Sequence, residues 1–393
     1  MISRRLRASI DATRNIKHTR IKNEQDIESE YKFMTLLGKG SFGTVSEAIR
    51  LYDQTGWAIK VINKEKAGSV GVKLLEREVL IMKMVNHPHI IHLEEVFETS
   101  HKMFLVMELC LQGALESLLK KVTYFEEKDV LCIFTQLADA IDYIHSNDII
   151  HRDLKLENIL LAPQLESLPY NIKLTDFGLS YTRGGSGSDY MMNQVVGTPI
   201  YMAPEVITRY DYSQQCDIWS AGVIMYKLLC GEPPFMASNE EELFILIQKG
   251  ELKFEKEKWK LVSPSAKHLL EGMLKVDPAH RITSKEILCH PWIKGDETVD
   301  KYATNVLEMM KEYNREQKLL NSSGINGGSS DISVHSSTSS QITVCSETKD
   351  RGSQISLKPH DKGKRNSLTG NVLYGKSTRS PKVSHSRGVT KKE

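Results

Sequence analysis

The chain has 393 residues, of which 40% are hydrophobic, enough for one large two-lobed unit or for two to three ordinary domains. Its net charge of +2 conceals a strong segregation, because residues 1–22 carry +6 and residues 321–393 carry +7, which leaves −11 for residues 23–320. An acidic body argues against a nucleic-acid-binding core and favours basic substrates, or basic tails that fold back on it. Basic ends that are solvated and bind nothing are an equal alternative.

Cysteine usage and hydropathy indicate a reducing compartment. The six cysteines are scattered without a CxxC pair, so the sequence supports neither a metal site nor a disulfide framework. No apolar run approaches the ~18 residues that a membrane-spanning helix needs, and arginines interrupt the beginning of the chain, where a signal peptide would be continuously apolar. We therefore expect a soluble, cytoplasmic protein with no membrane partner, and nuclear access stays open.

Secondary-structure patterns divide the middle of the chain into a β-rich part and a helical part. Between residues 31 and 61, β-prone runs alternate with a glycine-rich turn, which predicts an antiparallel sheet. Residues 72–84 change to helical spacing, and an apolar strand follows at 103–109. Further helical patterns occupy 130–145, 217–229, 240–248 and 266–274. The predicted fold class is α+β, with a small antiparallel β-rich lobe that carries one main helix, followed by a larger, mainly helical lobe.

Both ends of the chain differ in composition from this body. Residues 1–30 are basic, and we expect them to be flexible, whereas residues 294–320 form a polar extension with helical character. Residues 321–393 are crowded with serine, glycine and basic residues. Because they cannot bury enough apolar surface to offset the entropy of ordering, they predict a disordered tail.

A glycine-rich segment between two predicted strands is the first candidate binding feature. It comprises Gly38, Lys39, Gly40, Ser41, Phe42, Gly43, Thr44 and Val45. A dinucleotide fingerprint would open a helix and a Walker A loop would end in Gly-Lys-Ser/Thr, and neither condition holds. Between strands, the glycines let a hairpin lie close over nucleotide phosphates, although a plain turn can carry the same residues.

A lysine and a glutamate extend this candidate site. Lys60 ends a hydrophobic run, and Glu78 lies on the helix predicted to follow. By itself Lys60 would be an ordinary surface lysine. In this context Glu78 can pair with it and hold its ammonium group against the α- and β-phosphates of a nucleotide.

The most specific signal is a pair of motifs further along the chain. His151-Arg152-Asp153-Leu154-Lys155-Leu156-Glu157-Asn158 is followed by Asp176-Phe177-Gly178. Together with the preceding features, in this order, they resemble the eukaryotic protein-kinase family over residues 31–293. The resemblance implies a bilobal protein-kinase fold, with lobes at 31–108 and 109–293. It also implies ATP and Mg²⁺ as cofactors, with Mn²⁺ able to substitute for Mg²⁺.

The resemblance implies a role for each catalytic residue. Asp153 would accept the proton of the substrate hydroxyl, while Asn158 and Asp176 would hold two magnesium ions. Lys155 resembles the serine/threonine branch of the family, as does Thr198. The implied activity is therefore that of a non-specific serine/threonine protein kinase.

Structural roles follow from the same resemblance. Glu205 would form a buried pair with Arg281, and Asp217 would brace the catalytic loop. An apolar set would enclose the adenine ring, with a gatekeeper at Met107, although the same side chains would also suit a plain core. Adenine would lie between Val45 and Ala58 on one side and Leu160 on the other, and backbone groups of Glu108 and Cys110 would read its edge. Leu37 is a further cofactor-binding residue.

Residues 176–205 resemble an activation segment, whose added phosphate Arg152 would bind. Ser186, three residues after Arg183, is the first candidate for autophosphorylation, although most such serines are merely loop residues. The other candidates are Ser188, Tyr190 and Thr198.

Further motifs resemble the calcium/calmodulin-dependent kinase group. They lie at 231–235, 280–282 and 290–292, and segments 63–68, 212–217 and 304–311 resemble one member of that group in particular. Residues 301–318 interleave glutamates with basic residues, so we expect no direct calmodulin binding.

Protein substrates with serine or threonine acceptors are the expected partners. Ala114 stands where many relatives carry an acid that binds arginine, so a preference for basic substrates rests on Glu157 and Glu232. A pseudokinase or scaffold that binds nucleotide without phosphotransfer is the alternative, and it would lack Lys60 or one of the two catalytic aspartates, all of which are present. Nucleic-acid binding is not expected, because the basic ends lack interleaved aromatic residues.

Overall fold

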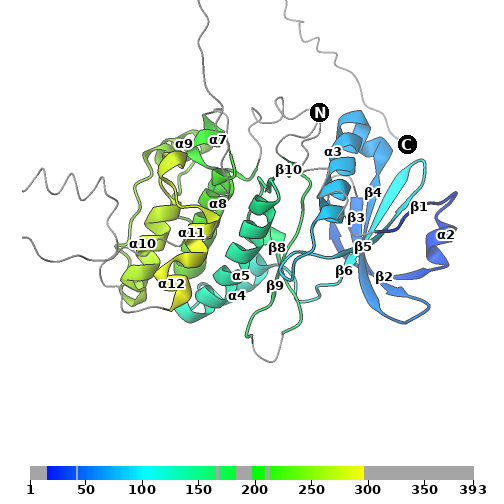
Figure 1. Cartoon of the computed structure of the whole chain (residues 1–393), viewed down its shortest axis with the longest axis horizontal. Coiled ribbons are helices and arrows are strands. Elements are labelled where there is room, and N and C mark those ends of the chain that lie inside the picture. Colours follow the sequence, from blue (N-terminus) through cyan, green and yellow to red (C-terminus); the bar gives the residue numbers. More distant parts are fainter. Residues whose placement is uncertain (1–15, 41–42, 165–167, 183–196, 209–212, 296–393) are drawn as a thin grey trace, which may run out of the picture. The chain divides into compact units, whose positions relative to one another are not determined.

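A computed structural model of the chain describes residues 16–40, 43–164, 168–182, 197–208 and 213–295. The chain divides into two units, 1–314 and 315–393, and every described residue lies in the first. Of the extension predicted at 294–320, residues 296–320 lie outside the described residues, as does the tail at 321–393. The fold is α+β, with a mostly antiparallel sheet in a small lobe and helices in a large lobe (Figure 1), as the sequence predicts.

The small lobe is built on a six-stranded sheet with the order β1-β5-β6-β4-β3-β2. Its strands are β1 (His18–Arg20), β2 (Tyr31–Lys39), β3 (Gly43–Arg50), β4 (Gly56–Asn63), β5 (Leu93–Glu98) and β6 (Lys102–Glu108). Because side chains alternate along a strand, the sheet has two faces. One face, with Ile62 and Leu105, joins the main core together with helix α3 (Lys64–Met84). The other, with Ile59 and Phe104, enters a separate, smaller core.

Helix α3 contains the segment that its spacing predicts, 72–84, and begins earlier. The Asn63 side chain accepts a hydrogen bond from the backbone nitrogen of Lys66 and so caps the first turn. Gly68 then interrupts the helix with φ 67°, a conformation that glycine adopts without steric cost. The amphipathic part after this break carries Glu78, which is buried.

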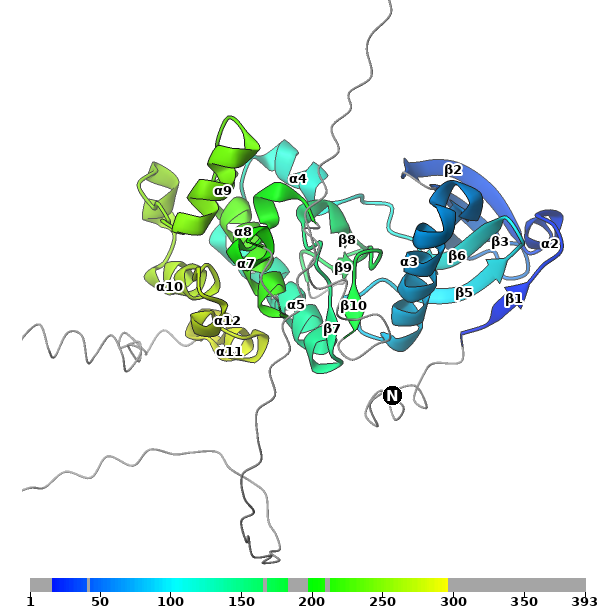
Figure 2. The same cartoon turned by 90° about the horizontal axis from the view of Figure 1, so that it is seen from above.

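Residues 16–30 correct the expectation of a flexible basic segment. Strand β1 pairs in parallel with β5 at the edge of the sheet (Figure 2). Helix α2 (Gln25–Glu28) inserts Ile27 into the smaller core, and Tyr31 donates a hydrogen bond of 2.6 Å to Glu95 Oε1. Composition misled here because a few apolar anchors among many charges are enough for docking when an open sheet edge also supplies backbone hydrogen bonds.

The large lobe is mainly helical and is organised around α8, whose residues from Cys216 to Cys230 are all buried. Its helices are α4 (Leu115–Val122), α5 (Glu127–Ser146), α7 (Pro204–Ile207), α8 (Gln215–Cys230), α9 (Glu240–Lys249), α10 (Pro264–Met273), α11 (Ser284–Cys289) and α12 (Pro291–Lys294). Short strands β7 (Ile149–Ile150), β8 (Ile159–Leu161), β9 (Ile172–Leu174) and β10 (Tyr181–Thr182) lie on the side of the small lobe (Figure 2). All four predicted helical patterns are confirmed. None of the helices in the described ranges could cross a membrane.

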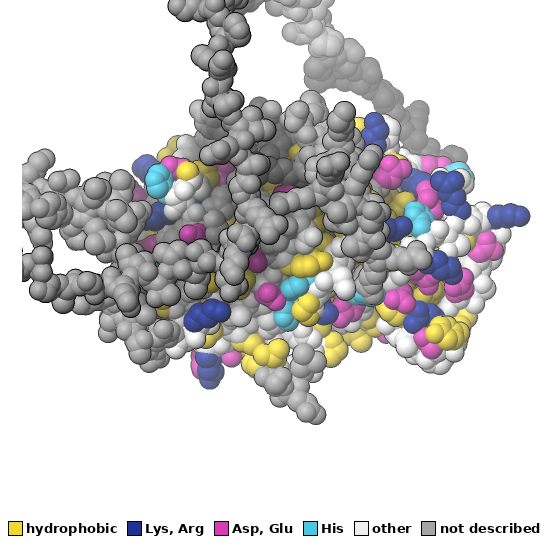
Figure 3. Space-filling view, in the orientation of Figure 1, with side chains coloured by type: hydrophobic (Ala, Val, Ile, Leu, Met, Phe, Trp, Pro, Cys, Tyr) yellow, Lys and Arg dark blue, Asp and Glu magenta, His cyan; other side chains and the backbone are white. Residues whose placement is uncertain are grey.

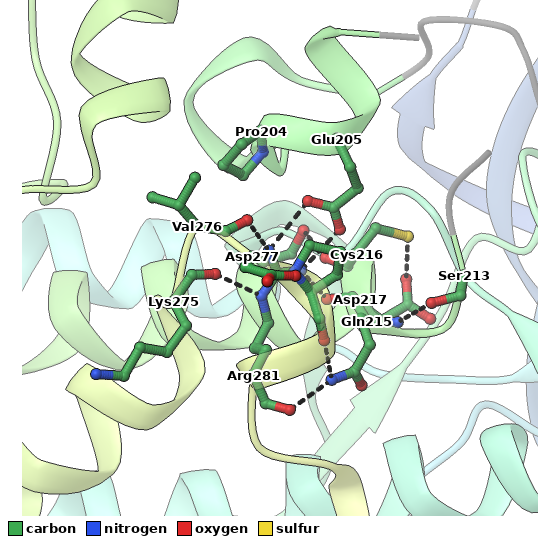
Figure 4. A network of polar contacts seen from close by, with 12 residues as sticks. Pro204, Glu205, Ser213, Gln215, Cys216, Asp217, Lys275, Val276, Asp277 and Arg281 are labelled. Atoms are coloured by element: carbon green, nitrogen blue, oxygen red, sulfur yellow. Dashed lines mark hydrogen bonds and ion pairs between the residues drawn. The ribbon is translucent and has the colours of Figure 1, made fainter. Parts of the chain in front are cut away.

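A buried ion pair fixes α7 within the large lobe, as the sequence predicts. Arg281 Nη1 and Nη2 donate to Glu205 Oε1 and Oε2 at 2.7 and 3.0 Å. The other guanidinium hydrogens go to the carbonyl oxygens of Lys275, Val276 and Gln215 (Figure 4). All five N–H groups of this buried side chain therefore have acceptors.

Two histidines, His268 on α10 and His290 at the N-cap of α12, contact each other near the end of the described chain. His290 Nδ1 accepts a hydrogen bond of 3.2 Å from the backbone nitrogen of Trp292, so a neutral ring carries its hydrogen on Nε2. Nε2 lies 3.0 Å from His268 Nδ1. Burial, and then the neighbouring His268, lower the pKa of His290 from 6.5 to about 4. The capping geometry thus depends on a neutral His290.

Candidate active site

The glycine-rich turn joins β2 to β3 at the mouth of the site. The backbone nitrogen of Gly40 donates to the carbonyl oxygen of Gly43 at 2.9 Å. A Cβ atom at Gly43 would lie 1.8 Å from the carbonyl oxygen of Val61 on β4, so glycine is needed there for the strands to approach. Ser41 and Phe42 lie outside the described residues.

Lys60 on β4 and Glu78 on α3 form the ion pair that the sequence predicts. Lys60 Nζ lies 2.7 Å from Glu78 Oε1 and 3.8 Å from Asp176 Oδ1. Burial would lower the pKa of Lys60, but the two carboxylates, Glu78 before Asp176, outweigh it and raise that pKa. The lysine therefore remains a cation, held between a helix of the small lobe and a loop of the large lobe.

Asp153 is oriented by three neighbouring side chains. Lys155 Nζ lies 2.6 Å from Asp153 Oδ2, and Asn158 Nδ2 donates both to Oδ2, at 3.2 Å, and to the carbonyl oxygen of Asp153, at 2.9 Å. The Thr198 hydroxyl lies 3.4 Å from Asp153 Oδ1 and 3.2 Å from Lys155 Nζ. These contacts fix the Asp153 carboxylate so that Oδ2 faces Lys155 and Asn158 and Oδ1 faces the Thr198 hydroxyl.

The catalytic loop and the segment after β9 both contain strained backbone. Arg152 and Asp176 have φ values of 68° and 66°, in the left-handed region that costs a non-glycine residue about 1–3 kcal/mol and is concentrated at functional sites. Phe177 is buried, with its ring centroid 5.0 Å from that of His151. This contact anchors the segment that presents Asp176 to the cleft.

Asp217 on α8 holds the backbone of the catalytic loop, as predicted. Its carboxylate accepts hydrogen bonds from the backbone nitrogens of His151 and Arg152, at 2.8 and 2.9 Å, and lies 2.9 Å from His145 Nε2. Burial would raise the pKa of Asp217, but the bonds from His145 and from the loop outweigh burial and hold that pKa below its ordinary value. A buried carboxylate thus fixes two consecutive peptide units of the loop.

A cavity of about 430 Å³ opens beside these groups. Its walls include eight residues predicted from the sequence: Gly40, Gly43, Thr44, Val45, Lys60, Glu78, Asp153 and Asp176. The other lining residues were not among the site residues predicted from the sequence: Ile62, Ala67, Gly71, Leu74, Leu75, Gly178 and Leu179. Helical spacing indicated that Leu74 and Leu75 are buried, but only the placement of α3 shows that they face this cavity.

Of the residues predicted to hold adenine, only Val45 lines this cavity. All of them except Cys110, which follows β6, lie on strands. Ala58 and Met107 are direct partners across β4 and β6, and Leu160 on β8 bridges to Ala114. Leu37 is exposed, and the glycine-rich hairpin pairs Gly38 with Val45 and Lys39 with Thr44. The backbone nitrogen of Glu108 donates to the carbonyl oxygen of His92 at 2.9 Å. Burial, and then Glu108, raise the pKa of the Cys110 thiol to about 12.

Asn158 and Asp176 offer oxygen ligands of the kind that Mg²⁺ prefers. Because Asn158 Nδ2 donates to Asp153, its amide oxygen is the atom left for a cation. The Asp176 side chain is 48% exposed, so its carboxylate is accessible. Within the described ranges no group of three or more His, Cys, Asp or Glu could hold a metal by itself. These residues fit magnesium.

Among the phosphorylation candidates, Ser186, Ser188 and Tyr190 lie outside the described residues. Thr198 is within them and belongs to the site itself through its contacts with Asp153 and Lys155. Arg152, expected to bind an added phosphate, donates through Nε to the carbonyl oxygen of Leu179 at 2.7 Å.

Comparison with known proteins agrees with this geometry. Residues 31–293 match the family described as protein kinase domain. The chain belongs to the protein kinase family. This kinase is 56% identical to serine/threonine-protein kinase 33 of Mus musculus over 302 residues, which are 76% of the chain and 62% of the mouse protein. It therefore spans less than two thirds of the length of that relative.

Two further relatives are more distant. The kinase is 38% identical to calcium-dependent protein kinase 5 of Plasmodium falciparum, over 78% of this chain and 51% of that one. It is also 38% identical to myosin light chain kinase A of Dictyostelium discoideum, over 73% of this chain and 95% of that one. The predicted resemblance to the calcium/calmodulin-dependent kinase group is confirmed. The member that segments 63–68, 212–217 and 304–311 resemble is serine/threonine-protein kinase 33.

Proposed function

We propose that the chain is an active, non-specific serine/threonine protein kinase (EC 2.7.11.1). It would transfer the γ-phosphoryl group of Mg-ATP to serine or threonine hydroxyls of proteins and autophosphorylate. The observation that carries this proposal is the convergence of Lys60, Glu78 and Asp176 within 3.8 Å at one cavity that Asp153 also lines. The pseudokinase alternative would require one of these groups to be lost or misplaced.

The geometry assigns a task to each side chain. Bound Mg-ATP supplies the phosphoryl group and, through the metal, neutralises part of its charge. Lys60, oriented by Glu78, provides a fixed cation for phosphate oxygens, and Asn158 and Asp176 would ligate magnesium. Asp153 Oδ1 orients the acceptor hydroxyl and accepts its proton. Lys155, 2.6 Å from the same carboxylate, places a second cation beside the group being transferred.

The proposal extends to partners and location. Protein substrates fit a cleft open enough for Asp176 to be about half exposed. On the face shown in Figure 3, acidic and basic side chains of the small lobe are interspersed, which does not favour nucleic-acid binding, since that requires a basic patch. We propose a cytoplasmic kinase that acts without direct calmodulin binding. The support for this is the composition and the acidic residues among the basic ones at 301–318.

Transfer of radioactive γ-phosphate from ATP to a mixed peptide library tests the proposal. The purified chain with Mg²⁺ should label peptides on serine and threonine. Asp153→Asn should lower the rate by about 10²–10⁴-fold, the usual contribution of a general base, and Asp176→Asn at least as much, because charge stabilisation is usually the larger effect. Asp277→Asn, an exposed change that retains a capping side chain, is the matched control. Failure of the unaltered chain to label any polypeptide would refute the proposed function.

A further inference from the structure

Lys227 is a buried cation next to the catalytic loop that the proposed mechanism does not use. It lies on α8 with only 9% of its surface exposed. Its Nζ atom donates to the Tyr201 hydroxyl at 3.2 Å and lies 3.4 Å from Glu116 Oε2 on α4. A buried ammonium group is costly unless such partners compensate it, so these two contacts define its environment.

The surroundings of Lys227 are adjacent to the place where the acceptor hydroxyl must bind. Tyr201 lines the same small hollow as Asp153 and Thr198. Burial raises the pKa of Tyr201, and the carboxylates of Glu157, Glu116 and Asp153 raise it further. The phenol therefore lies in the field of all three acids. Lys227 is therefore linked, through Tyr201, to the hollow that Asp153 lines.

The charges of this group are unevenly compensated. Glu116 is paired with Lys227 and, through its other oxygen, with the exposed Lys120 at 3.2 Å. Glu157 lies on the turn η1 (Leu156–Asn158), against which α4 packs, is exposed, and has no cationic partner among the described residues. Of the two neighbouring acids, only Glu157 is therefore available to a basic side chain of a substrate.

A further acid of the large lobe, Glu232, is compensated as well. Glu232, one of the two residues on which a basic preference was expected to rest, forms an ion pair with Lys256. Both partners of that pair are about half exposed, so solvent weakens it. Lys227, in contrast, is held in place by burial and by two hydrogen-bonding partners.

We propose that Lys227 is a specificity-determining residue of the peptide-binding surface. By compensating Glu116 it prevents a second acid from selecting a basic side chain, so the kinase selects at most one basic residue near the acceptor, through Glu157. This inference rests on the proposed kinase activity and names the substrate class of the same site: peptides with one basic residue beside the acceptor, not a run of several.

The test uses the full chain, Mg-ATP and a positional peptide library with arginine or alanine at each place flanking one serine. The measured quantity is the ratio of kcat/KM for arginine over alanine at each position. Lys227→Met, which retains the length of the aliphatic stem, should raise this ratio at one new position by roughly three- to tenfold, the range for one charge-assisted contact that is partly screened. Lys120→Met removes an exposed cation from the same glutamate and should leave every ratio within about twofold.

Two further variants secure the interpretation. Glu116→Gln in the Lys227→Met background should abolish the gain, because the released acid is then gone. Glu157→Gln alone should remove the arginine preference of the unaltered enzyme. If Lys227→Met is too damaged to assay, Glu116→Gln alone should lower acceptance of arginine, since it leaves the ammonium uncompensated.

Unchanged arginine ratios in an active Lys227→Met enzyme, or in Glu116→Gln when that is the only active variant, would overturn the inference about specificity. A chain that phosphorylates no peptide before any substitution would instead refute the kinase function itself.

Discussion

Replacing Ile27 by alanine tests whether the segment before the family-matched domain is part of the folded kinase. Ile27 is fully buried in the smaller core, together with Phe97 and Phe104 of the sheet. An Ile→Ala change in a core lowers the free energy of unfolding by about 2–5 kcal/mol, because buried apolar atoms are lost and a cavity remains. Helix α2 has only four residues and can relax into part of the space, so we expect about 2–3 kcal/mol.

For a domain of this size, that loss corresponds to a fall in melting temperature of roughly 5–10 °C. Calorimetry of the full chain would measure it, with Glu28→Ala, an exposed change on the same short helix, as the matched control. Tyr31→Phe should also lower the melting temperature, by about half as much, because it removes the buried hydrogen bond to Glu95. An Ile27→Ala protein that melts within about 1 °C of the unaltered chain would show that residues 16–30 behave as the charge pattern alone predicts.

Three further predictions concern the rest of the fold. Between pH 6.5 and 4 the unfolded chain takes up a proton at His290 that the folded chain excludes, so stability should fall by about 2 kcal/mol as the pH decreases through this window. His290→Asn, which retains a cap acceptor, should flatten that dependence in urea melts at several pH values, and an unchanged slope would contradict it. Glu205→Gln should cost about 3–5 kcal/mol, because it leaves the buried Arg281 without its counter-charge; denaturation that matches the parent would exclude this role. Gly43→Ala should yield little soluble kinase, since its methyl group would overlap the Val61 carbonyl oxygen, and normal expression with an unchanged melting temperature would disprove the steric argument.

The chemistry of the site could be predicted because each group belongs to a short motif. The glycine-rich hairpin, Lys60, and the loops that carry Asp153 and Asp176 occur in an order typical of one family, and residue type together with order is enough to assign roles. The helices could be predicted for a similar reason, since the periodicity of α5 and α8 is a local property of the chain.

Tertiary structure decided what depends on partners far apart in the sequence. The docking of β1 on β5 joins residues almost 80 positions apart, and nothing in a basic N-terminal composition signals it. The role proposed for Lys227 has no local sequence signal either, because a lysine on a hydrophobic helix only interrupts the apolar pattern. Its partner Glu116 is 111 positions away and reaches its ammonium group only in the folded chain.

The sequence by itself thus determined the family and predicted the reaction and the groups that would carry it, because short-range order encodes these. Only the folded chain decided which charges near the acceptor are compensated, which face of α3 meets the cleft and where the small lobe begins. Those properties depend on burial and on long-range contacts, and both exist only once the sheet and the helices have packed together.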